Sequence, residues 1–334
     1  MFKRISHAVA ASTLLAGALL GTAQAADTLT FGIISTESSQ NLRSVWDPFL
    51  ADMSKQTGYQ VKAFFAPDYA GVIQGMRFDK VDLAWYGNKS AMEAVDRANG
   101  EVFAQTVAAN GSPGYYSHLI VHRDSPLNSV EDVLAKAKDL TFANGDPNST
   151  SGYLVPGYYV FARNKVDASR IFKRSLNGSH EVNALSVANK QVDVGTFNSE
   201  GMERLQITAP DKAAQLKVIW TSPLIPADPL VWRKSLSDEQ KSRLREFFMS
   251  YGATPAEKEI LAGLQWAPFR ASDNDQLLPI RQLELFKKRS EVAADSKLSD
   301  GERQARLQNI DQELATLEQR MAERQQEAEA AKAS

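Results

Sequence analysis

Three consecutive hydroxyl side chains, Ser149, Thr150 and Ser151, form the segment of this chain best suited to binding chemistry. They follow a predicted strand over 140–143 and open a predicted helix over about 151–162. Because the first-turn amides of a helix carry partial positive charge, hydroxyls placed there can surround an oxyanion without a lysine. The alternative is that one serine only caps the helix, and the motif alone favours neither interpretation.

Two tyrosines lie at turns where another part of a binding site could form. Tyr69 stands within Pro67–Gly71, a strand-to-helix turn in the first half of the chain that corresponds to the hydroxyl run. Tyr115 comes just before an extended segment, where it would either face a cleft or cover it. Tyrosine at such positions more often packs than binds, so the pattern leaves both roles open.

Two acidic residues, Glu200 and Asp228, lie where an anion site would not place them. Glu200 follows a predicted strand over 192–197, and Asp228 falls within a proline-rich extended segment. Taken singly, each is typical of a solvated surface carboxylate. If both face the cleft, they would bind a cation on the same ligand, which would then carry an oxyanion and an ammonium group.

The common motifs of nucleotide-binding and hydrolytic enzymes do not occur in the sequence. The Walker A, G-x-G-x-x-G, H-E-x-x-H and G-x-S-x-G patterns are all missing. The chain has no cysteine, and His118 and His122, which share one face of a predicted strand, have no third ligand nearby. We therefore expect no metal and no cofactor, and a binding protein rather than an enzyme.

Composition and charge narrow the classes of partner. The 334 residues include 38 lysines and arginines against 40 acids, which gives a net charge of −2. Without a basic excess the chain cannot neutralise a phosphate backbone, so we expect no nucleic-acid partner. The length fits about two lobes of ordinary domain size.

Residues 1–25 are predicted to be a secretory signal peptide. Lys3 and Arg4 precede an apolar run over 5–20, and Ala23-Gln24-Ala25 provides a small-x-small cleavage site. The alternative, a retained membrane anchor, needs a longer apolar run. We expect cleavage after Ala25 and a mature protein that is soluble in the periplasm.

The elements that must position these side chains alternate in the manner of an α/β fold. Predicted strands cover 29–34, 61–65, 81–86, 140–143 and 192–197, and predicted helices about 41–55, 69–78, 151–162 and 181–190. The strands that begin Val81-Asp82 and Val192-Asp193 repeat one pattern in the two halves of the chain. This repeat indicates two similarly built lobes.

Two extended segments, near 116–122 and 224–232, are predicted to join the lobes. Lobe 1 would then comprise residues 26–118 and 225–285, and lobe 2 residues 119–224. Because α/β sheets bind ligands at the carboxyl ends of their strands, we expect the site in the cleft between the lobes.

The remaining residues, 286–334, are predicted to form a helical extension. Ser299–Glu302 is a capping box that opens a long helix. An apolar stripe follows at spacings of three and four: Leu307, Ile310, Leu314, Leu317 and Met321. The stripe predicts packing on the body of the same chain, contact with a second copy, or a frayed tail.

Four motifs together resemble one known family, the phosphonate-binding proteins of bacterial ABC-type phosphonate importers. They are FGIISTE at 31–37, APDYAG at 66–71, GDPNSTSG at 145–152 and WAPFR at 266–270. The resemblance covers essentially the whole body of the mature chain and is less specific in the C-terminal helix. It implies a type II periplasmic binding protein fold, with two lobes that close on alkylphosphonates, preferably 2-aminoethylphosphonate.

The resemblance also implies a role for each matching residue. The anion shell around the phosphonate would consist of Ser149, Thr150, Ser151, Tyr69, Tyr115 and His180. Glu200 and Asp228 would bind the ammonium group. The family further implies an ABC transporter permease in the inner membrane as partner, and a homodimer through the C-terminal helix.

The sequence thus predicts a periplasmic receptor that delivers phosphonates to an import permease. One alternative is a receptor for phosphate, phosphite or another small oxyanion. Another is a periplasmic hydrolase of phosphoesters or phosphonates. A sensory subunit that reports the ligand to a membrane kinase is a third.

Overall fold

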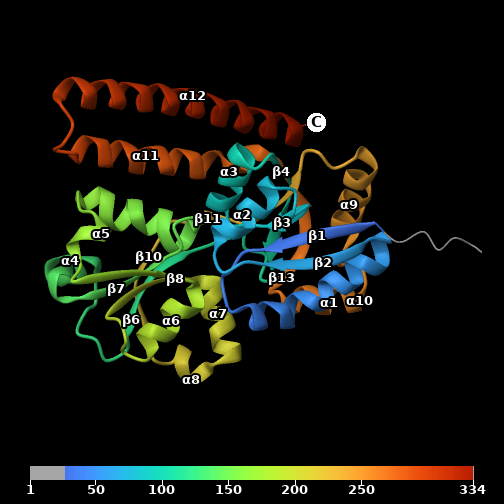
Figure 1. Ribbon diagram of the computed structural model, residues 1–334, viewed down its shortest axis with the longest axis horizontal. Helices are drawn as coiled ribbons and strands as arrows, with labels where there is room; N and C mark the ends of the chain where they lie inside the picture. Colours follow the sequence, from blue (N-terminus) through green and yellow to red (C-terminus); the bar gives the residue numbers. More distant parts are fainter. Residues whose placement is uncertain (1–26, 334) are drawn as a thin grey trace, which may run out of the picture.

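The computed structural model describes residues 27–333, so the predicted signal peptide lies outside the described residues. Two sheets flanked by helices, followed by a long C-terminal helix, confirm the predicted fold class (Figure 1). We refer to the first sheet with its helices as lobe 1 and to the second as lobe 2. Within residues 27–333, no helix combines the length and the apolar composition that a membrane span requires.

The sheet of lobe 1 has the strand order β13-β4-β12-β3-β1-β2. Strands β1, β2 and β3 are parallel, whereas β12 and β13 pair antiparallel with their neighbours. The strands are β1 (Thr28–Ile33), β2 (Gln60–Phe65), β3 (Leu83–Trp85), β4 (Gly100–Ala108), β12 (Pro229–Arg233) and β13 (Trp266–Ala271). The helices are α1 (Ser39–Thr57), α2 (Tyr69–Arg77), α3 (Asn88–Arg97), α9 (Asp238–Ser250) and α10 (Pro255–Gly263).

The sheet of lobe 2 has the strand order β10-β6-β9-β7-β8. Its strands are β6 (Ser117–His122), β7 (Thr141–Gly145), β8 (Arg174–Gly178), β9 (Val194–Asn198) and β10 (Leu216–Thr221). Its helices are α4 (Val130–Lys136), α5 (Ala168–Ile171), α6 (His180–Ala188), α7 (Ser199–Thr208) and α8 (Pro210–Ala213). Shorter 3₁₀ turns are η1 (Ala137–Asp139) and η4 (Ala162–Asn164), and π-helical turns are η2 (Thr150–Leu154) and η3 (Gly157–Phe161).

The repeated Val-Asp pattern marks equivalent strands of the two sheets. In each sheet a central strand, β3 or β9, runs parallel to one neighbour and antiparallel to the other. The aspartate before each strand also makes the same contact, because Asp82 Oδ2 accepts from the Thr30 N–H and Asp193 Oδ2 from the Thr141 N–H, both at 2.7 Å. The two lobes therefore share one local construction.

The chain crosses between the lobes at two short strands, β5 (Gly114–Tyr115) and β11 (Ile225–Pro226), which pair antiparallel. The crossings are shorter than the extended segments predicted from the sequence, because residues 117–122 and 229–233 are already strands of the two sheets. A Cβ at Gly114 would lie 1.8 Å from the Ile225 carbonyl oxygen, so only glycine allows the strands to approach this closely. The boundaries between lobe 1 and lobe 2 after residues 118 and 224 remain a prediction from the sequence.

The apolar core of lobe 1 lies between its sheet and its helices. Phe31 of β1, Trp46 and Phe49 of α1, and Trp232 of β12 are fully buried there. Burial of aromatic side chains of this size contributes much of a domain's hydrophobic stabilisation. The strands that end at the cleft are therefore held on a rigid base.

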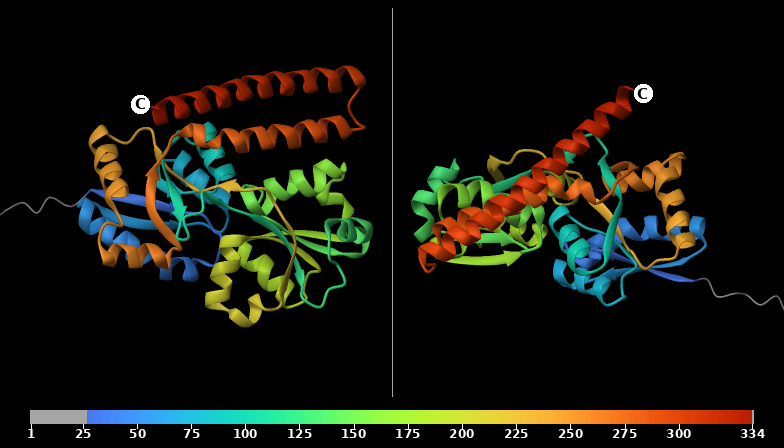
Figure 2. Two further views of the ribbon diagram at one scale, coloured as in Figure 1. Left: turned by 180° about the vertical axis from the view of Figure 1, so that it is seen from behind. Right: turned by 90° about the horizontal axis from the view of Figure 1, so that it is seen from above.

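The C-terminal segment is a hairpin of two helices, α11 (Leu278–Ala294) and α12 (Asp300–Ala333), that lies across the top of both lobes in Figures 1 and 2. Helix α11 runs through the predicted limit at residue 285. Ile310 and Leu314 of the apolar stripe are buried as α12 packs along α11. The stripe is thus used within the chain, which is the first of the three predicted alternatives.

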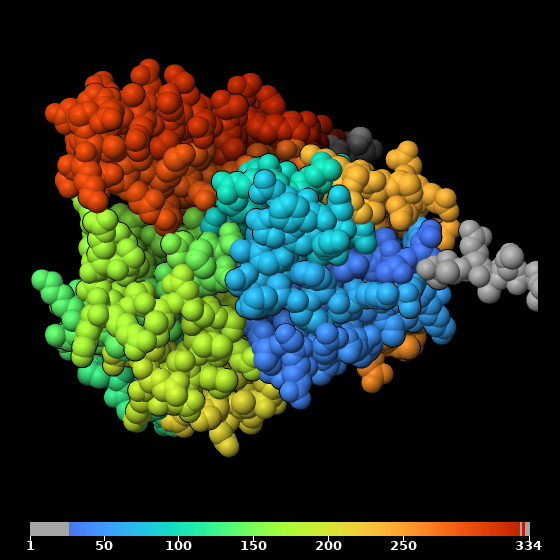
Figure 3. Space-filling view, viewed as in Figure 1, coloured from blue at the N-terminus to red at the C-terminus, as the bar shows by residue number. Residues whose placement is uncertain are grey.

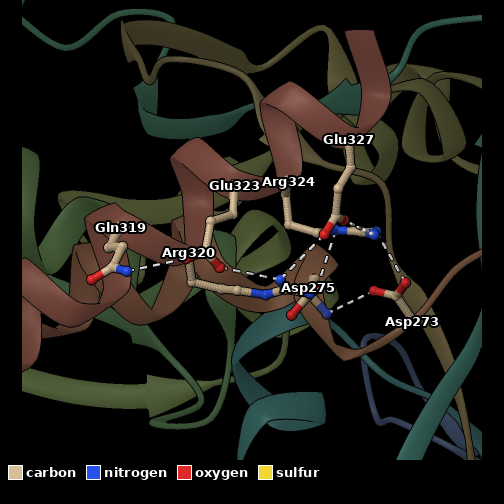
Figure 4. Close-up of polar contacts among 7 residues, drawn as sticks. All are labelled: Asp273, Asp275, Gln319, Arg320, Glu323, Arg324 and Glu327. Atoms are coloured by element: carbon tan, nitrogen blue, oxygen red, sulfur yellow. Dashed lines mark hydrogen bonds and ion pairs between the residues drawn. The ribbon is translucent and has the colours of Figure 1, made fainter. Parts of the chain in front are cut away.

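Helix α12 is also fixed to lobe 1 by a cluster of ion pairs (Figure 4). Arg320 contacts Asp275 at 2.6 Å, and Arg324 contacts Asp273 at 3.0 Å and Asp275 at 3.1 Å. Both aspartates belong to the turn around η5 (Asn274–Leu277), which precedes α11. The far end of the hairpin is therefore tied back to the start of its own first helix.

Helix α11 contacts both lobes. Ile280 and Leu283 share an apolar cluster with the crossing strands and with Leu154 of lobe 2. On its other side, Arg281 makes a bidentate ion pair with Asp96 of α3 in lobe 1, at 2.8 and 2.6 Å. The helix therefore bridges the hinge region.

Candidate functional site

The eight residues predicted to bind ligand all line a single cavity between the lobes, with a volume of about 90 Å³. They come from the start of α2, from β5, from η2, from the starts of α6 and α7, and from the loop between β11 and β12. The helix starts follow the carboxyl ends of β2, β7, β8 and β9, where α/β sheets bind ligands. On the face shown in Figure 3, the blue surface of lobe 1 and the yellow-green surface of lobe 2 meet directly.

The hydroxyl run lies in the π-helical turn η2 rather than in an α-helix. The first hydrogen bond of this turn joins the Leu154 N–H to the Ser149 carbonyl at 3.1 Å, five residues apart. An α-helix closes the same bond over four residues, so the wider turn leaves one additional amide at its start without an intrahelical partner. A Cβ at Gly145 would lie 2.5 Å from the Gly152 backbone, so glycine is required where the strand meets this turn.

Each hydroxyl oxygen of the run already accepts a hydrogen bond from the protein: Ser149 from the Gly152 N–H (2.9 Å), Thr150 from the Lys89 N–H (2.9 Å), and Ser151 from Asn198 Nδ2 (3.2 Å). An oxygen that accepts keeps its own proton for donation. The capping interpretation is therefore correct for Ser149, and it leaves the O–H of Ser149 available to an anion. The run presents three oriented donors.

His180 is the first residue of α6 and is buried beside the hydroxyl run. Its Nε2 lies 3.4 Å from Ser149 Oγ and 3.3 Å from Ser151 Oγ. Burial lowers the pKa of the imidazole to about 4, so the ring is neutral at physiological pH and has one N–H to donate. His180 Nδ1 and Trp85 Nε1, both in the cavity wall, are buried without a hydrogen-bond partner among residues 27–333. Buried polar atoms of this kind are costly unless a ligand pairs with them.

Tyr69 and Tyr115 present buried phenols to the same cavity. Burial, reinforced by nearby carboxylates, raises the pKa of both phenols, so both stay protonated as donors. The Tyr115 hydroxyl donates to Asp228 Oδ1 at 2.9 Å. In this structure Tyr115 thus orients a carboxylate, whereas the family resemblance implied a place in the anion shell.

Glu200 and Asp228 form the acidic part of the cavity. Burial raises the pKa of Glu200 to about 7, with Glu203 adding repulsion and Arg204 opposing it. Burial and the charge of Glu200 raise the pKa of Asp228 well above its usual range. Two neighbouring carboxylates are costly to ionise together away from water, and a cation bound beside them lowers the pKa of both. The arrangement therefore suits a ligand whose positive charge lies close to its oxyanion.

Four contacts across the cleft hold the lobes in a closed arrangement. The Tyr69 N–H donates to Asp146 Oδ2 at 3.1 Å, and Arg204 forms an ion pair with Glu37 at 3.0 Å. Glu181 accepts the other two, from the Ser38 N–H at 2.7 Å and from Asn41 Nδ2 at 2.5 Å. Glu37, Glu181 and Arg204 also line the cavity, so these contacts lie at its rim. The side chains of Arg204 and Glu37 are each only 18% exposed. The residues that hold the lobes together therefore also form part of the cavity wall.

Comparison with known proteins identifies the family. The family model described as the periplasmic substrate-binding protein of phosphonate ABC transporters matches residues 31–277. The chain belongs to this family. A phosphonates-binding periplasmic protein of Escherichia coli is 63% identical over 290 residues, which cover 87% of this chain and 86% of that protein.

Two further relatives support the assignment. The crystal structure of a binding protein component of an ABC phosphonate transporter from Pseudomonas aeruginosa matches with a TM-score of 0.89 and 71% identity, covering 90% of this chain and 99% of that one. A phosphate-import protein of Mycolicibacterium smegmatis is 31% identical over 73% of this chain and 81% of its own length. These homologues are transporter binding proteins, and the resemblance drawn from the four motifs is confirmed.

Sequence reasoning missed several residues of this phosphonate-binding family site. Trp85 and Asn198 line the cavity, and the backbone N–H of Lys89 holds Thr150. Gly87, two residues after β3, is the N-cap of α3, and Asn198, the last residue of β9, is the N-cap of α7. The repeat therefore contained the signal, because equivalent strands end at equivalent helix starts.

Proposed function

We propose that this chain binds phosphonates that carry a terminal amine, preferably 2-aminoethylphosphonate, and delivers them to an ABC transporter permease in the inner membrane. The observation that carries this proposal is one interlobe cavity lined both by neutral donors at helix starts and by two carboxylates with raised pKa values. Tyr69, Ser149, Thr150, Ser151 and His180 would donate to the phosphonate oxygens. Glu200 and Asp228 would accept from the ammonium group, with Tyr115 orienting Asp228.

The charges around the cavity support the amine. Arg204, a cation of the cavity wall, is paired with Glu37. A bare oxyanion would therefore meet neutral donors and two acids whose ionisation it opposes. An ammonium group two carbons away from the phosphonate reverses this effect, since it stabilises the carboxylates in their charged form.

Isothermal titration calorimetry with 2-aminoethylphosphonate, methylphosphonate and phosphate tests the proposal. We expect a dissociation constant in the micromolar range or tighter for 2-aminoethylphosphonate, which corresponds to about −8 kcal/mol or more. Several charge-assisted hydrogen bonds of about 1.5–3 kcal/mol each can supply that free energy. Phosphate binding as tight as that of the aminophosphonate would contradict the proposed preference.

A receptor for phosphate or another small oxyanion is the second candidate, and the phosphate-import relative favours it. Such a receptor gains nothing from ionised Glu200 and Asp228. Two results together would support this candidate over the first. Phosphate would bind more tightly than methylphosphonate, and the affinity for phosphate would not change in a Glu200→Gln variant.

Two further features are proposed on the same family basis. Removal of the signal peptide would give a periplasmic protein that begins at Ala26, which N-terminal sequencing of the exported protein can test.

The homodimer would use the outer face of α12, because Ile310 and Leu314 of its inner face are buried within the chain. Sedimentation equilibrium of the mature protein tests this, and a monomer mass at high micromolar concentration would contradict it.

A further inference from the structure

The indole N–H of Trp85 is a donor of the cavity wall that the proposed ligand contacts do not use. Trp85 is the last residue of β3, lines the interlobe cavity and is 9% exposed. Its Nε1 is buried and has no hydrogen-bond partner within residues 27–333. A buried N–H is costly to leave unpaired, so we expect an acceptor to reach it when the site is filled.

The pairing of β3 with β12 brings Asp228 to the end of β3. Trp85 lies opposite Leu230 in this antiparallel register, and a Cβ at Gly87 would lie 3.9 Å from Asp228 Oδ1. On the other side, the Asp228 carbonyl accepts from the Thr106 N–H of β4 at 2.9 Å. The backbone of Asp228 is therefore fixed beside the strand that ends in Trp85.

The ring of Trp85 is held in place by aromatic packing. Its centroid lies 5.5 Å from that of Trp46 and 5.8 Å from that of Trp266, and the last two rings are 5.3 Å apart. The indole N–H is a donor only, so it can bind a carboxylate or another oxyanion but not an ammonium group. A fixed donor of this kind suits the carboxylate of Asp228.

The groups around Asp228 act on its charge in opposite directions. Burial and the charge of Glu200 on α7 raise the pKa of Asp228, whereas Tyr115 of β5 and the adjacent N–H of Trp85 oppose this rise. Tyr69 of α2 is the other titratable group that interacts with Asp228, and its phenol is protonated. A carboxylate has about four acceptor positions, so two donors leave room for an ammonium group.

We infer that Trp85 is a positioning residue for the amine of the ligand: its Nε1–H donates to the Asp228 carboxylate in the loaded site and thereby favours phosphonates that carry a cation. The inference deepens the proposed function and rests on it, because Trp85 acts through Asp228. Tyr115 already donates to Oδ1 at 2.9 Å. With both donors in place, the carboxylate is held in one orientation and in its charged form.

Calorimetry of a Trp85→Phe variant with 2-aminoethylphosphonate and methylphosphonate tests the inference. Phenylalanine keeps an aromatic ring in the cluster and removes the N–H. We expect 2-aminoethylphosphonate to bind about tenfold or more weakly, and methylphosphonate to change by less than about threefold. The affinity for 2-aminoethylphosphonate should also begin to fall at a higher pH, because Asp228 without this donor is harder to ionise.

Trp266→Phe is the matched control, because it changes an indole of the same aromatic cluster. It should alter neither the preference between the two ligands nor the pH dependence. A second measurement uses the unmodified protein with its five tryptophans labelled with ¹⁵N. One indole N–H signal should move downfield with 2-aminoethylphosphonate and not with methylphosphonate, since that N–H gains a charged acceptor.

Three results overturn the inference: equal losses for both ligands in a folded Trp85→Phe variant, an unchanged affinity for 2-aminoethylphosphonate, or no selective downfield shift. Retained binding of methylphosphonate shows that the variant is folded, and the labelled unmodified protein decides if it is not. Failure of the proposed function is distinguishable, because the unmodified protein would then not prefer 2-aminoethylphosphonate to methylphosphonate.

Discussion

Replacement of Glu200 by glutamine gives the sharpest test of the site, because it removes one charge and keeps the shape of the side chain. The pKa of Glu200 is raised to about 7, so at pH 8 its ionisation costs little and the carboxylate is charged before the ligand arrives. The variant should therefore lose a charge-assisted hydrogen bond of about 1.5–3 kcal/mol, without an offset from desolvation. This corresponds to roughly a ten- to hundredfold weaker dissociation constant for 2-aminoethylphosphonate.

Methylphosphonate provides the internal comparison in the same calorimetric experiment. It has no ammonium group, so Glu200→Gln should leave its affinity unchanged or raise it, since a negative charge near the phosphonate disappears. Glu203→Gln, an exposed carboxylate of the same helix, is the matched control and should affect neither ligand strongly. Equal losses for the two ligands in Glu200→Gln would refute the assignment of Glu200 to the amine.

Three further predictions follow from the pKa values and the contacts. Affinity for 2-aminoethylphosphonate should fall as the pH is lowered from 8 to 6, because Glu200 becomes protonated below about pH 7, and a flat calorimetric profile would contradict this. Glu181→Ala removes the contacts with Ser38 and Asn41, so the closed form should become less populated. Ligand dissociation should then be about three- to tenfold faster in stopped-flow measurements. An unchanged dissociation rate would show that these contacts do not control opening. Asp275→Asn should weaken the attachment of α12 to lobe 1 by about 1 kcal/mol. Hydrogen exchange over residues 319–327 should become faster, with no change in ligand affinity. An exchange rate equal to that of the unmodified protein would contradict the stabilising role of these ion pairs.

The sequence predicted the parts of the fold that have a strong local signal. The parallel strands β1, β2, β3, β7 and β9 are short apolar runs, and each lies within two residues of its predicted start. The Val-Asp repeat also pointed to equivalent strands, and the matching contacts of Asp82 and Asp193 give its physical reason. The clustering of six site residues followed because strand ends of parallel units meet at one edge: Tyr69, Ser149, Thr150, Ser151, His180 and Glu200.

What the sequence could not predict depends on long-range pairing. Residues 117–122 and 229–233 read as extended linkers, yet they are strands because each pairs with partners more than seventy residues away in the chain. The π-helical form of η2 was also missed, since nothing local distinguishes five-residue from four-residue hydrogen bonding at Ser149. The link between Tyr115 and Asp228 joins residues that only the folded crossing strands bring together.

The attachment of α11 to both lobes has a mechanical consequence. Any rotation that separates the lobes must also slide this helix over Leu154 or strain its ion pair with Asp96. We therefore expect the hinge to be stiffer than two bare strands would make it, and the empty protein to sample a narrower range of open shapes. A narrower range means that less conformational entropy is lost when a small solute is captured, so a ligand of few atoms can still be held firmly.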